Sequence, residues 1–177
     1  IFDVSGSSTP TLDGSYAPPG GAPGPGWADD GYVYLRSGTS SLLVLKRNVA
    51  GTALDQVGSL DLGAEATGRP EKSGDYLYQQ LKDGNLLVIS VADPTAPAIA
   101  GRCAAQRTGK MTVAQSCAFI ASSGYVDLYD GGKPAAPRFL ASLADSGMAP
   151  SGISTAGDVL LISDGSAKRL RCYRILK

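Results

Sequence analysis

Residues 88–102 read VISVADPTAPAIAGR, and residues 1–15 read IFDVSGSSTPTLDGS. Each stretch holds an alternating apolar strand, a polar turn with a proline, a second short strand and a glycine at one fixed offset. Residues 128–142, LYDGGKPAAPRFLAS, follow the same plan, and residues 44–59 form a looser copy without prolines. Alternation with period two predicts strands, and the recurrence of the unit predicts a repeat protein.

A further short apolar run, ending in a glycine or aspartate turn, accompanies each unit. The runs are GYVYLRSG at 31–38, DYLYQQLKDG at 75–84, CAFIASSG at 117–124 and DVLLISDG at 158–165. Their starts are spaced by roughly forty to forty-four residues, the period of a four-stranded propeller blade. A weaker strand precedes each run, most clearly at 152–158. We therefore predict an all-β fold, a β-propeller of four-stranded antiparallel blades, with about four units of 40–44 residues.

A helical solenoid is the rival architecture, because its repeats have a similar length. No window carries apolar residues at helical spacing with helix caps, so strands are favoured. We expect one domain over residues 1–177, either a propeller or a fragment of a larger one. Its units lie at roughly 1–19, 20–62, 63–105, 106–145 and 146–177. Residues 172–175 repeat the position of residues 1–4, so a fragment of a larger ring is the simpler interpretation.

Charge and composition limit the possible partners. Sixteen basic residues balance sixteen acidic residues, and histidine is absent. A zero net charge draws the chain neither to nucleic acid nor to anionic lipid. Without histidine a Ser-His-Asp triad is impossible, and the commonest zinc ligand is missing. The sequence holds no run of about eighteen apolar residues, so no membrane span is expected. We predict no cofactor and no metal site.

The three cysteines are Cys103, Cys117 and Cys172. They are too few for a disulfide scaffold and include no C-x-x-C pair of the kind that binds zinc or performs redox chemistry. Cys103 and Cys117 could form a disulfide if they flank one loop. The alternative is that each cysteine is a small buried hydrophobic residue.

The segments IFDVSGSSTP at 1–10, LLVISVADPTAP at 86–97 and YVDLYDGGKPAAP at 125–137 resemble LVIVD-type propeller repeats. In that family each unit ends in an apolar strand, a D-P-x-x-P turn and a short second strand, which corresponds to residues 11–16 here. The resemblance implies a bacterial propeller that is exported or attached to the cell surface. An extracellular, cell-surface or periplasmic location is therefore expected. No catalytic residues are carried over from the family.

Ligands usually bind to propellers where the ring axis opens, among the loops that lead into the innermost strands. Repeat alignment places these loops at 20–30, 63–73, 105–114 and 145–152. The first loop holds the single tryptophan, Trp27, beside Asp29 and Asp30. Trp27 either stacks on a ligand or fills the gap between two blades. The aspartates lack a D-x-D-x-D-G pattern, which favours turn residues over calcium ligands.

The second and third loops carry charged candidates. Arg69 could bind a carboxylate or phosphate bidentately, with Glu71 nearby, although mixed charges can equally form a solvated edge. Lys110 belongs to a basic stretch between two cysteines that could contact an acidic partner. These residues complete the set of candidate ligand-binding positions.

Three functions remain open from the residues. The first is a non-enzymatic binding or scaffold module that engages a protein or glycan partner through its axial loops. The second is a histidine-free hydrolase or lyase that uses Asp29, Asp30 or Glu71 as carboxylates at the axis. The third is a structural subunit of a larger surface assembly.

Overall fold

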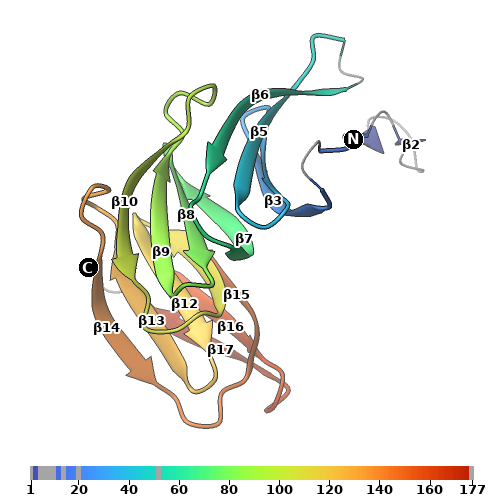
Figure 1. Ribbon diagram of the computed structural model, residues 1–177. Helices are drawn as coiled ribbons and strands as arrows, with labels where there is room; N and C mark the ends of the chain where they lie inside the picture. Colours follow the sequence, from blue (N-terminus) through green and yellow to red (C-terminus); the bar gives the residue numbers. More distant parts are fainter. Residues whose placement is uncertain (1, 4–10, 13–14, 19–20, 51–52, 176–177) are drawn as a thin grey trace.

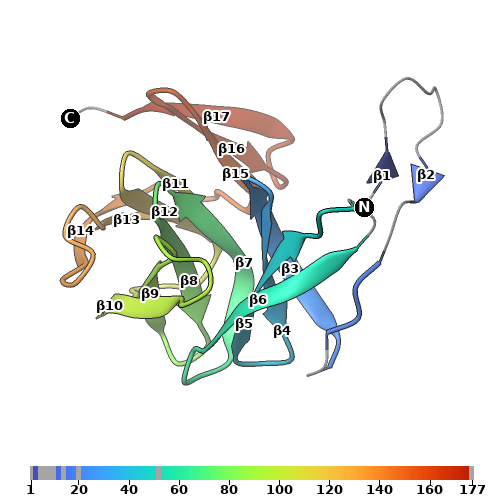
Figure 2. The same cartoon turned by 90° about the horizontal axis from the view of Figure 1, so that it is seen from above.

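Alternating apolar and polar residues form antiparallel strands throughout the described chain. The computed structural model describes residues 2–3, 11–12, 15–18, 21–50 and 53–175. Over this part the chain contains strands and no helix, and therefore no helix that could span a lipid bilayer. The strands form short sheets around a common axis, which Figures 1 and 2 show from two directions. The predicted all-β propeller is confirmed.

Consecutive strands pair within each sheet, from the axis outward. The first blade contains β3 (Pro23–Asp29), β4 (Tyr32–Ser37), β5 (Ser41–Arg47) and β6 (Leu54–Asp61). The second contains β7 (Ala66–Ser73), β8 (Tyr76–Leu81), β9 (Asn85–Ser90) and β10 (Ala98–Ala104). The third contains β11 (Lys110–Ala114), β12 (Cys117–Ser122), β13 (Tyr125–Asp130) and β14 (Arg138–Ala144).

The last sheet contains three strands in the described residues, as expected for a chain whose end repeats the position of its first residues: β15 (Pro150–Ala156), β16 (Val159–Asp164) and β17 (Arg169–Arg174). A separate hairpin pairs β1 (Phe2–Asp3) with β2 (Thr11–Leu12) and lies on the side of the first blade (Figure 2). In the alignment of residues 1–15 with residues 88–102, these two strands correspond to β9 and β10, which pair in the same way.

The first strand of each blade lies at the axis, where β3, β7, β11 and β15 come together (Figure 2). Most residues that the sequence placed in axial loops belong instead to these inner strands. The sequence PGPGWAD of β3 looks like a loop because it is rich in glycine and proline. Gly24 and Gly26 nevertheless suit the strand: a Cβ atom would lie 2.5 Å from Arg36 Nε at Gly24, and 2.7 Å from the Tyr34 carbonyl oxygen at Gly26.

Three clusters of buried apolar side chains hold neighbouring blades together. They join the first and second blades, the second and third, and the third and fourth, and they include the pairs Leu42 and Leu77, Val88 and Ile120, and Phe119 and Ile162. Burying one such side chain contributes about 1.5–3 kcal/mol. Each blade therefore owes much of its stability to the blade beside it.

The proline turn packs against the outer strand of the preceding blade. A Cβ atom on Gly101 of β10 would lie 2.3 Å from the carbonyl oxygen of Pro134 and 2.8 Å from Pro137 Cδ. Gly58 of β6 faces Pro94 in the same way, at 2.4 Å from its carbonyl oxygen. The glycine and the proline turn of the repeat thus form one contact between blades.

Cys103 and Cys117, for which the sequence left a disulfide and single buried thiols as alternatives, are both free in the structure. Cys103 packs against the cluster between the second and third blades, whereas Cys117 packs against the cluster between the third and fourth blades. The two side chains therefore serve opposite faces of the third blade. Burial raises the pKa of both thiols, which keeps them protonated at neutral pH.

Candidate ligand-binding site

All four blades contribute to a cavity of about 350 Å³ at the axis. Pro25 of β3, Arg69 and Glu71 of β7, Lys110 of β11 and Ile153 of β15 are among its lining residues. Strand alternation places Arg69 and Glu71 on the same face of β7, because residues i and i+2 point the same way. The inner strands thus gather one buried carboxylate and two cations around one space.

Arg69 is held from two sides. Its Nε and Nη2 atoms donate to Glu71 Oε1 at 2.9 Å and 2.6 Å. Its guanidinium carbon lies 5.2 Å from the centre of the Trp27 ring, within the range of a cation–π contact. The Arg69 side chain is still 53% exposed, whereas that of Glu71 is 4% exposed. A charged fork fixed in this way loses little conformational freedom when it binds an anion.

Burial raises the pKa of Glu71 above its ordinary value, and the hydrogen bond and charge of Arg69 oppose that rise. A buried carboxylate with a raised pKa in a cavity is a feature of functional sites, although ion-pair networks also produce it. In this cavity the direct effect of Glu71 is to orient Arg69.

Trp27 packs against the cluster between the first and second blades, as the gap-filling alternative required. Its indole Nε1 atom is buried and has no hydrogen-bond partner among the described residues. Trp27 therefore supports the Arg69 side chain from behind and does not itself line the axial cavity.

Asp29 and Asp30 do not line the axial cavity. Asp29 Oδ2 lies 2.8 Å from Lys72 Nζ, in an ion pair that joins the inner strands of the first two blades. Asp30 has a φ of 51° and, with Gly31 at 79°, forms the two-residue turn between β3 and β4. The described residues contain no group of three or more potential metal ligands.

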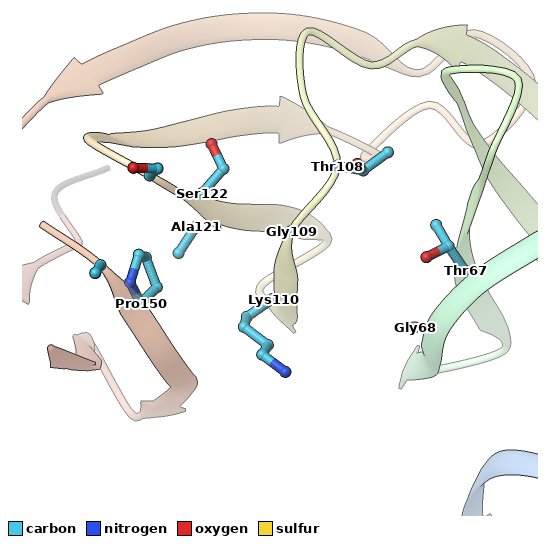
Figure 3. A pocket seen from close by; sticks show the side chains of 10 residues that line it. Thr67, Gly68, Thr108, Gly109, Lys110, Ala121, Ser122 and Pro150 are labelled. Carbon is cyan, nitrogen blue, oxygen red and sulfur yellow. The ribbon is translucent and has the colours of Figure 1, made fainter. Parts of the chain in front are cut away.

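Lys110 also lines a second cavity of about 570 Å³, between the second, third and fourth blades. Figure 3 shows its side chain extending into the opening between Gly68 and Pro150. Its ammonium group forms no ion pair with any side chain in the described part of the chain. Arg107, from the same basic stretch, is instead paired with Asp127, with Nη1 and Oδ1 2.8 Å apart.

Sequence reasoning missed Gln80, which lines the axial cavity from β8. Its amide exchanges hydrogen bonds with Gly109, both at 3.0 Å. The signal was the pair Gln79 and Gln80 within the otherwise apolar run at 75–84. Two amides in an apolar strand must find buried partners, and these partners lie in part on the next blade.

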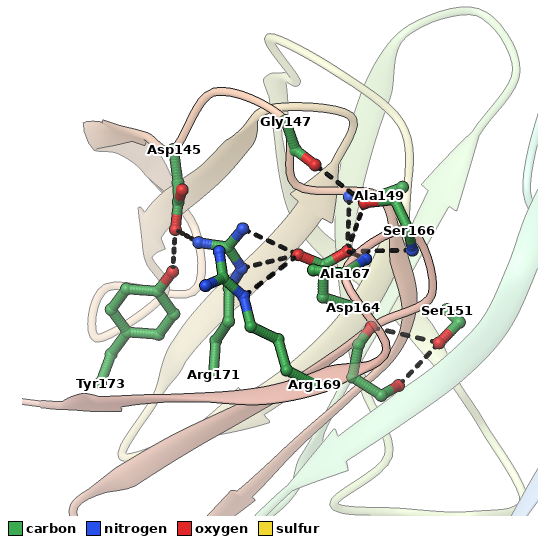
Figure 4. A network of polar contacts seen from close by, with 11 residues as sticks. Asp145, Gly147, Ala149, Ser151, Asp164, Ser166, Ala167, Arg169, Arg171 and Tyr173 are labelled. Carbon is green, nitrogen blue, oxygen red and sulfur yellow. Dashed lines mark hydrogen bonds and ion pairs between the residues drawn. The ribbon is translucent and has the colours of Figure 1, made fainter.

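A second polar network lies away from the axial cavity, in the fourth blade (Figure 4). Asp164 Oδ2 accepts hydrogen bonds from Arg171 Nε at 2.8 Å, and Asp164 Oδ1 accepts one from Ser166 Oγ at 2.7 Å. Arg171 also pairs with Asp145, whose Oδ2 atom accepts from Tyr173 Oη at 2.6 Å. These contacts join the loop before β15 to strand β17. The polar side chains of the network thus satisfy one another's hydrogen bonds.

Solved structures with the same fold include natural and designed proteins. BamB from Moraxella catarrhalis matches with a TM-score of 0.64 and 11% identity, over 87% of this chain and 42% of BamB. The computationally designed Ika4 protein matches with a TM-score of 0.66 and 11% identity, over 93% of this chain and 98% of Ika4.

A protein of unknown function from Desulfotomaculum acetoxidans matches with a TM-score of 0.63 and 14% identity, over 82% of this chain and 51% of that protein. This chain therefore spans less than two thirds of the length of BamB and of the Desulfotomaculum protein. At these identities the likeness shows the fold alone. No curated protein matches the sequence significantly.

Residues 72–105 match the family model of the LVIVD repeat. They run from the end of β7 through β8, β9 and β10, and they include the proline turn at 93–97. The expected resemblance is thus confirmed in the second blade. The chain is a β-propeller that contains an LVIVD repeat.

Proposed function

We propose that the chain is a binding module whose axial cavity receives an anionic group of a protein or glycan partner. The observation that carries the proposal is the fixed, half-exposed guanidinium of Arg69. Glu71 engages two of its nitrogen atoms through Oε1, and the third nitrogen, Nη1, remains for a ligand. Lys110 adds a second positive charge to the same lining. Charge-assisted hydrogen bonds of this kind are about twice as strong as neutral ones.

A hydrolase or lyase that uses two carboxylates is less well supported. Such chemistry needs two carboxyl groups facing one substrate, about 5–9.5 Å apart. Glu71 is the one carboxylate among the described residues that line the axial cavity. Asp29 is paired with Lys72, and Asp30 lies in a turn.

The proposal includes a location outside the cytoplasm, as the LVIVD resemblance implies. Fractionation of the source cells, followed by detection of the chain with an antibody, tests this part separately. Recovery of the chain from the cytoplasm would remove the location and leave the binding site open to test.

An array of defined glycans and acidic peptides, probed with the labelled chain, tests the binding role. We expect Arg69→Ala to weaken binding to the anionic probes by about tenfold or more, because a charged hydrogen bond is worth about 1.5–3 kcal/mol. Arg138→Ala is the matched control, since Arg138 lies on the outer strand β14 and is 71% exposed beside Asp130. Equal loss in both variants, or none in Arg69→Ala, rejects the proposed site.

A further inference from the structure

Two polar side chains bridge neighbouring blades at the same position of the repeat. Arg36 is the penultimate residue of β4, and Gln80 is the penultimate residue of β8. Arg36 Nη1 donates to the carbonyl oxygen of Ala66, where β7 begins. Gln80 donates to the carbonyl oxygen of Gly109, just before β11, and accepts from the Gly109 N–H group. Each bridge ties the second strand of one blade to the inner strand of the next.

The third bridge of this series is missing. The penultimate residue of β12 is Ala121, whose methyl group has no polar atom. The position that corresponds to Ala66 and Gly109 is Pro150, the first residue of β15, whose ring nitrogen carries no hydrogen. Ala121 and Pro150 both line the cavity of about 570 Å³. The cavity therefore lies where a bridging side chain would join the third blade to the fourth (Figure 3).

Hydroxyl groups and one cation dominate the polar lining of this cavity. Thr67, Thr108, Ser122 and Ser123 supply the hydroxyls, and Lys110 supplies the charge. Ser122 Oγ is buried without a hydrogen-bond partner among the described residues. The cavity lining includes no carboxylate among the described residues, so the net charge of the lining is positive.

The apolar part of the lining is made of small residues. Alanine, proline and glycine carry it, and no aromatic or long aliphatic side chain of the described residues contributes. A protein partner usually anchors itself through aromatic or aliphatic side chains in fitted pockets, and such a pocket is missing here. Hydroxyl groups both donate and accept, which suits a ligand that carries hydroxyls of its own. The volume lies in the range of small-molecule sites, about 300–1,000 Å³.

We propose that this cavity binds a carboxylate-bearing sugar residue of an acidic glycan. Lys110 pairs with the sugar carboxylate, and the threonine and serine hydroxyls bind the ring hydroxyls. The sugar takes the place of the missing bridge between the third and fourth blades. This inference rests on the proposed function, because Gly68, Gly109 and Lys110 line both this cavity and the axial one.

Titration calorimetry with a trisaccharide of galacturonic acid tests the inference, with a neutral galactose trisaccharide beside it. We expect the acidic probe to bind and the neutral probe to bind at least tenfold more weakly. Lys110→Gln should weaken the acidic probe by about ten- to hundredfold, the equivalent of one charged hydrogen bond. Lys133→Gln, on the outer proline turn of the same blade, is the matched control and should bind like the wild type.

Ala121→Gln tests the missing bridge directly. A glutamine there fills the cavity and can reach the Pro150 carbonyl group, so binding of the acidic trisaccharide should be lost. The midpoint of thermal unfolding should not fall, because a bridge between blades is added. If Ala121→Gln does not fold, Lys110→Gln and Arg69→Ala together decide the question, because Lys110 lines both cavities and Arg69 lines only the axial one: binding of the acidic trisaccharide should fall in Lys110→Gln and persist in Arg69→Ala.

Three results would overturn the inference. They are undiminished binding of the acidic trisaccharide to Lys110→Gln or to a folded Ala121→Gln, equal binding of the neutral trisaccharide, and binding of acetylated triglutamate in place of the sugar. In the last case, loss of triglutamate binding in Arg69→Ala would keep the proposed binding function while this glycan site fails.

Discussion

Gly101 is a position of the repeat that leaves no room for a side chain. In β10 it faces the proline turn of the next blade, and a Cβ atom there would meet the Pro134 carbonyl oxygen at 2.3 Å. That oxygen belongs to the backbone and cannot move aside as a flexible side chain would. The φ angle of Gly101 lies outside the left-handed region, so its backbone conformation does not require glycine. The close contact between blades is therefore what requires glycine at this position.

We expect Gly101→Ala to destabilise the fold by about 1–3 kcal/mol, the usual cost of forcing extra atoms into a packed site. Urea denaturation followed by circular dichroism measures the loss. Gly165→Ala is the control, because the nearest atom to its Cβ would be Ser151 Cβ at 3.7 Å, an ordinary contact. A Gly101→Ala protein as stable as the wild type would show that the two blades separate without cost at this point.

Contacts of single residues could be predicted from the sequence within one strand but not between blades. The spacing of Arg69 and Glu71 by two positions predicts a shared strand face, and the structure places them together in one ion pair. The contact of Arg69 with Trp27 joins two blades and depends on how far neighbouring sheets are rotated. No local pattern encodes that rotation, so Trp27 could be named as a candidate but not assigned to either of its two roles.

Among the strands, the β16–β17 hairpin carries a dense network of polar contacts. Asp164 accepts from Ser166, Arg171 and the backbone of Ala149 and Ala167. The Ser166 hydroxyl contributes most, and together these donors hold the pKa of Asp164 well below its ordinary value. The pKa of the neighbouring Asp145 is also lowered, by the Tyr173 hydroxyl and by Arg171.

A lowered pKa in the folded state predicts how stability depends on pH. Both carboxylates contribute stability that is complete above their unfolded pKa of about 3.9 and is lost as the pH falls toward the folded pKa. We expect the melting temperature to decline below about pH 4 and Asp164→Asn to melt earlier than the wild type at pH 7. The difference between the two proteins should shrink at pH 2. A constant difference from pH 7 to pH 2 would show that the charge of Asp164 does not stabilise the hairpin.

The second and third strands could be predicted from the sequence with nearly their observed bounds, whereas the inner strands were predicted only as weak strands, of which the one at 152–158 overlaps β15. The apolar runs at 75–84 and 117–124 became β8 and β12 because buried strands select apolar residues on both faces. The inner strand β3 contains Pro23, Pro25 and two glycines, which locally favour a turn. In β3, the close approach of β4 selects glycine, since a Cβ atom at Gly26 would lie 2.7 Å from the Tyr34 carbonyl oxygen. Glycine and proline therefore predict a loop from the sequence of β3, although this segment forms a strand in the structure.

For the whole molecule, stability is shared among blades, because each apolar cluster belongs to two neighbouring sheets. Removing one blade would expose one or two clusters, and none of the sheets has a complete core of its own. A unit that depends on its neighbours in this way is expected to unfold together with them. The repeats are separate segments of the sequence, but the stability of each one depends on its neighbours.

Ile120→Ala tests this coupling, because Ile120 is fully buried in the cluster between the second and third blades. The cavity should cost about 2–5 kcal/mol. Trp27, the single tryptophan, lies in the cluster between the first and second blades and reports on a different interface. Tryptophan fluorescence and far-ultraviolet circular dichroism should both shift to lower urea, with coincident midpoints. Leu170→Ala, at a side chain that is 58% exposed, should leave both midpoints nearly unchanged. If fluorescence keeps its wild-type midpoint while the dichroism transition divides, the blades unfold independently, and the sharing of clusters does not make the propeller one cooperative unit.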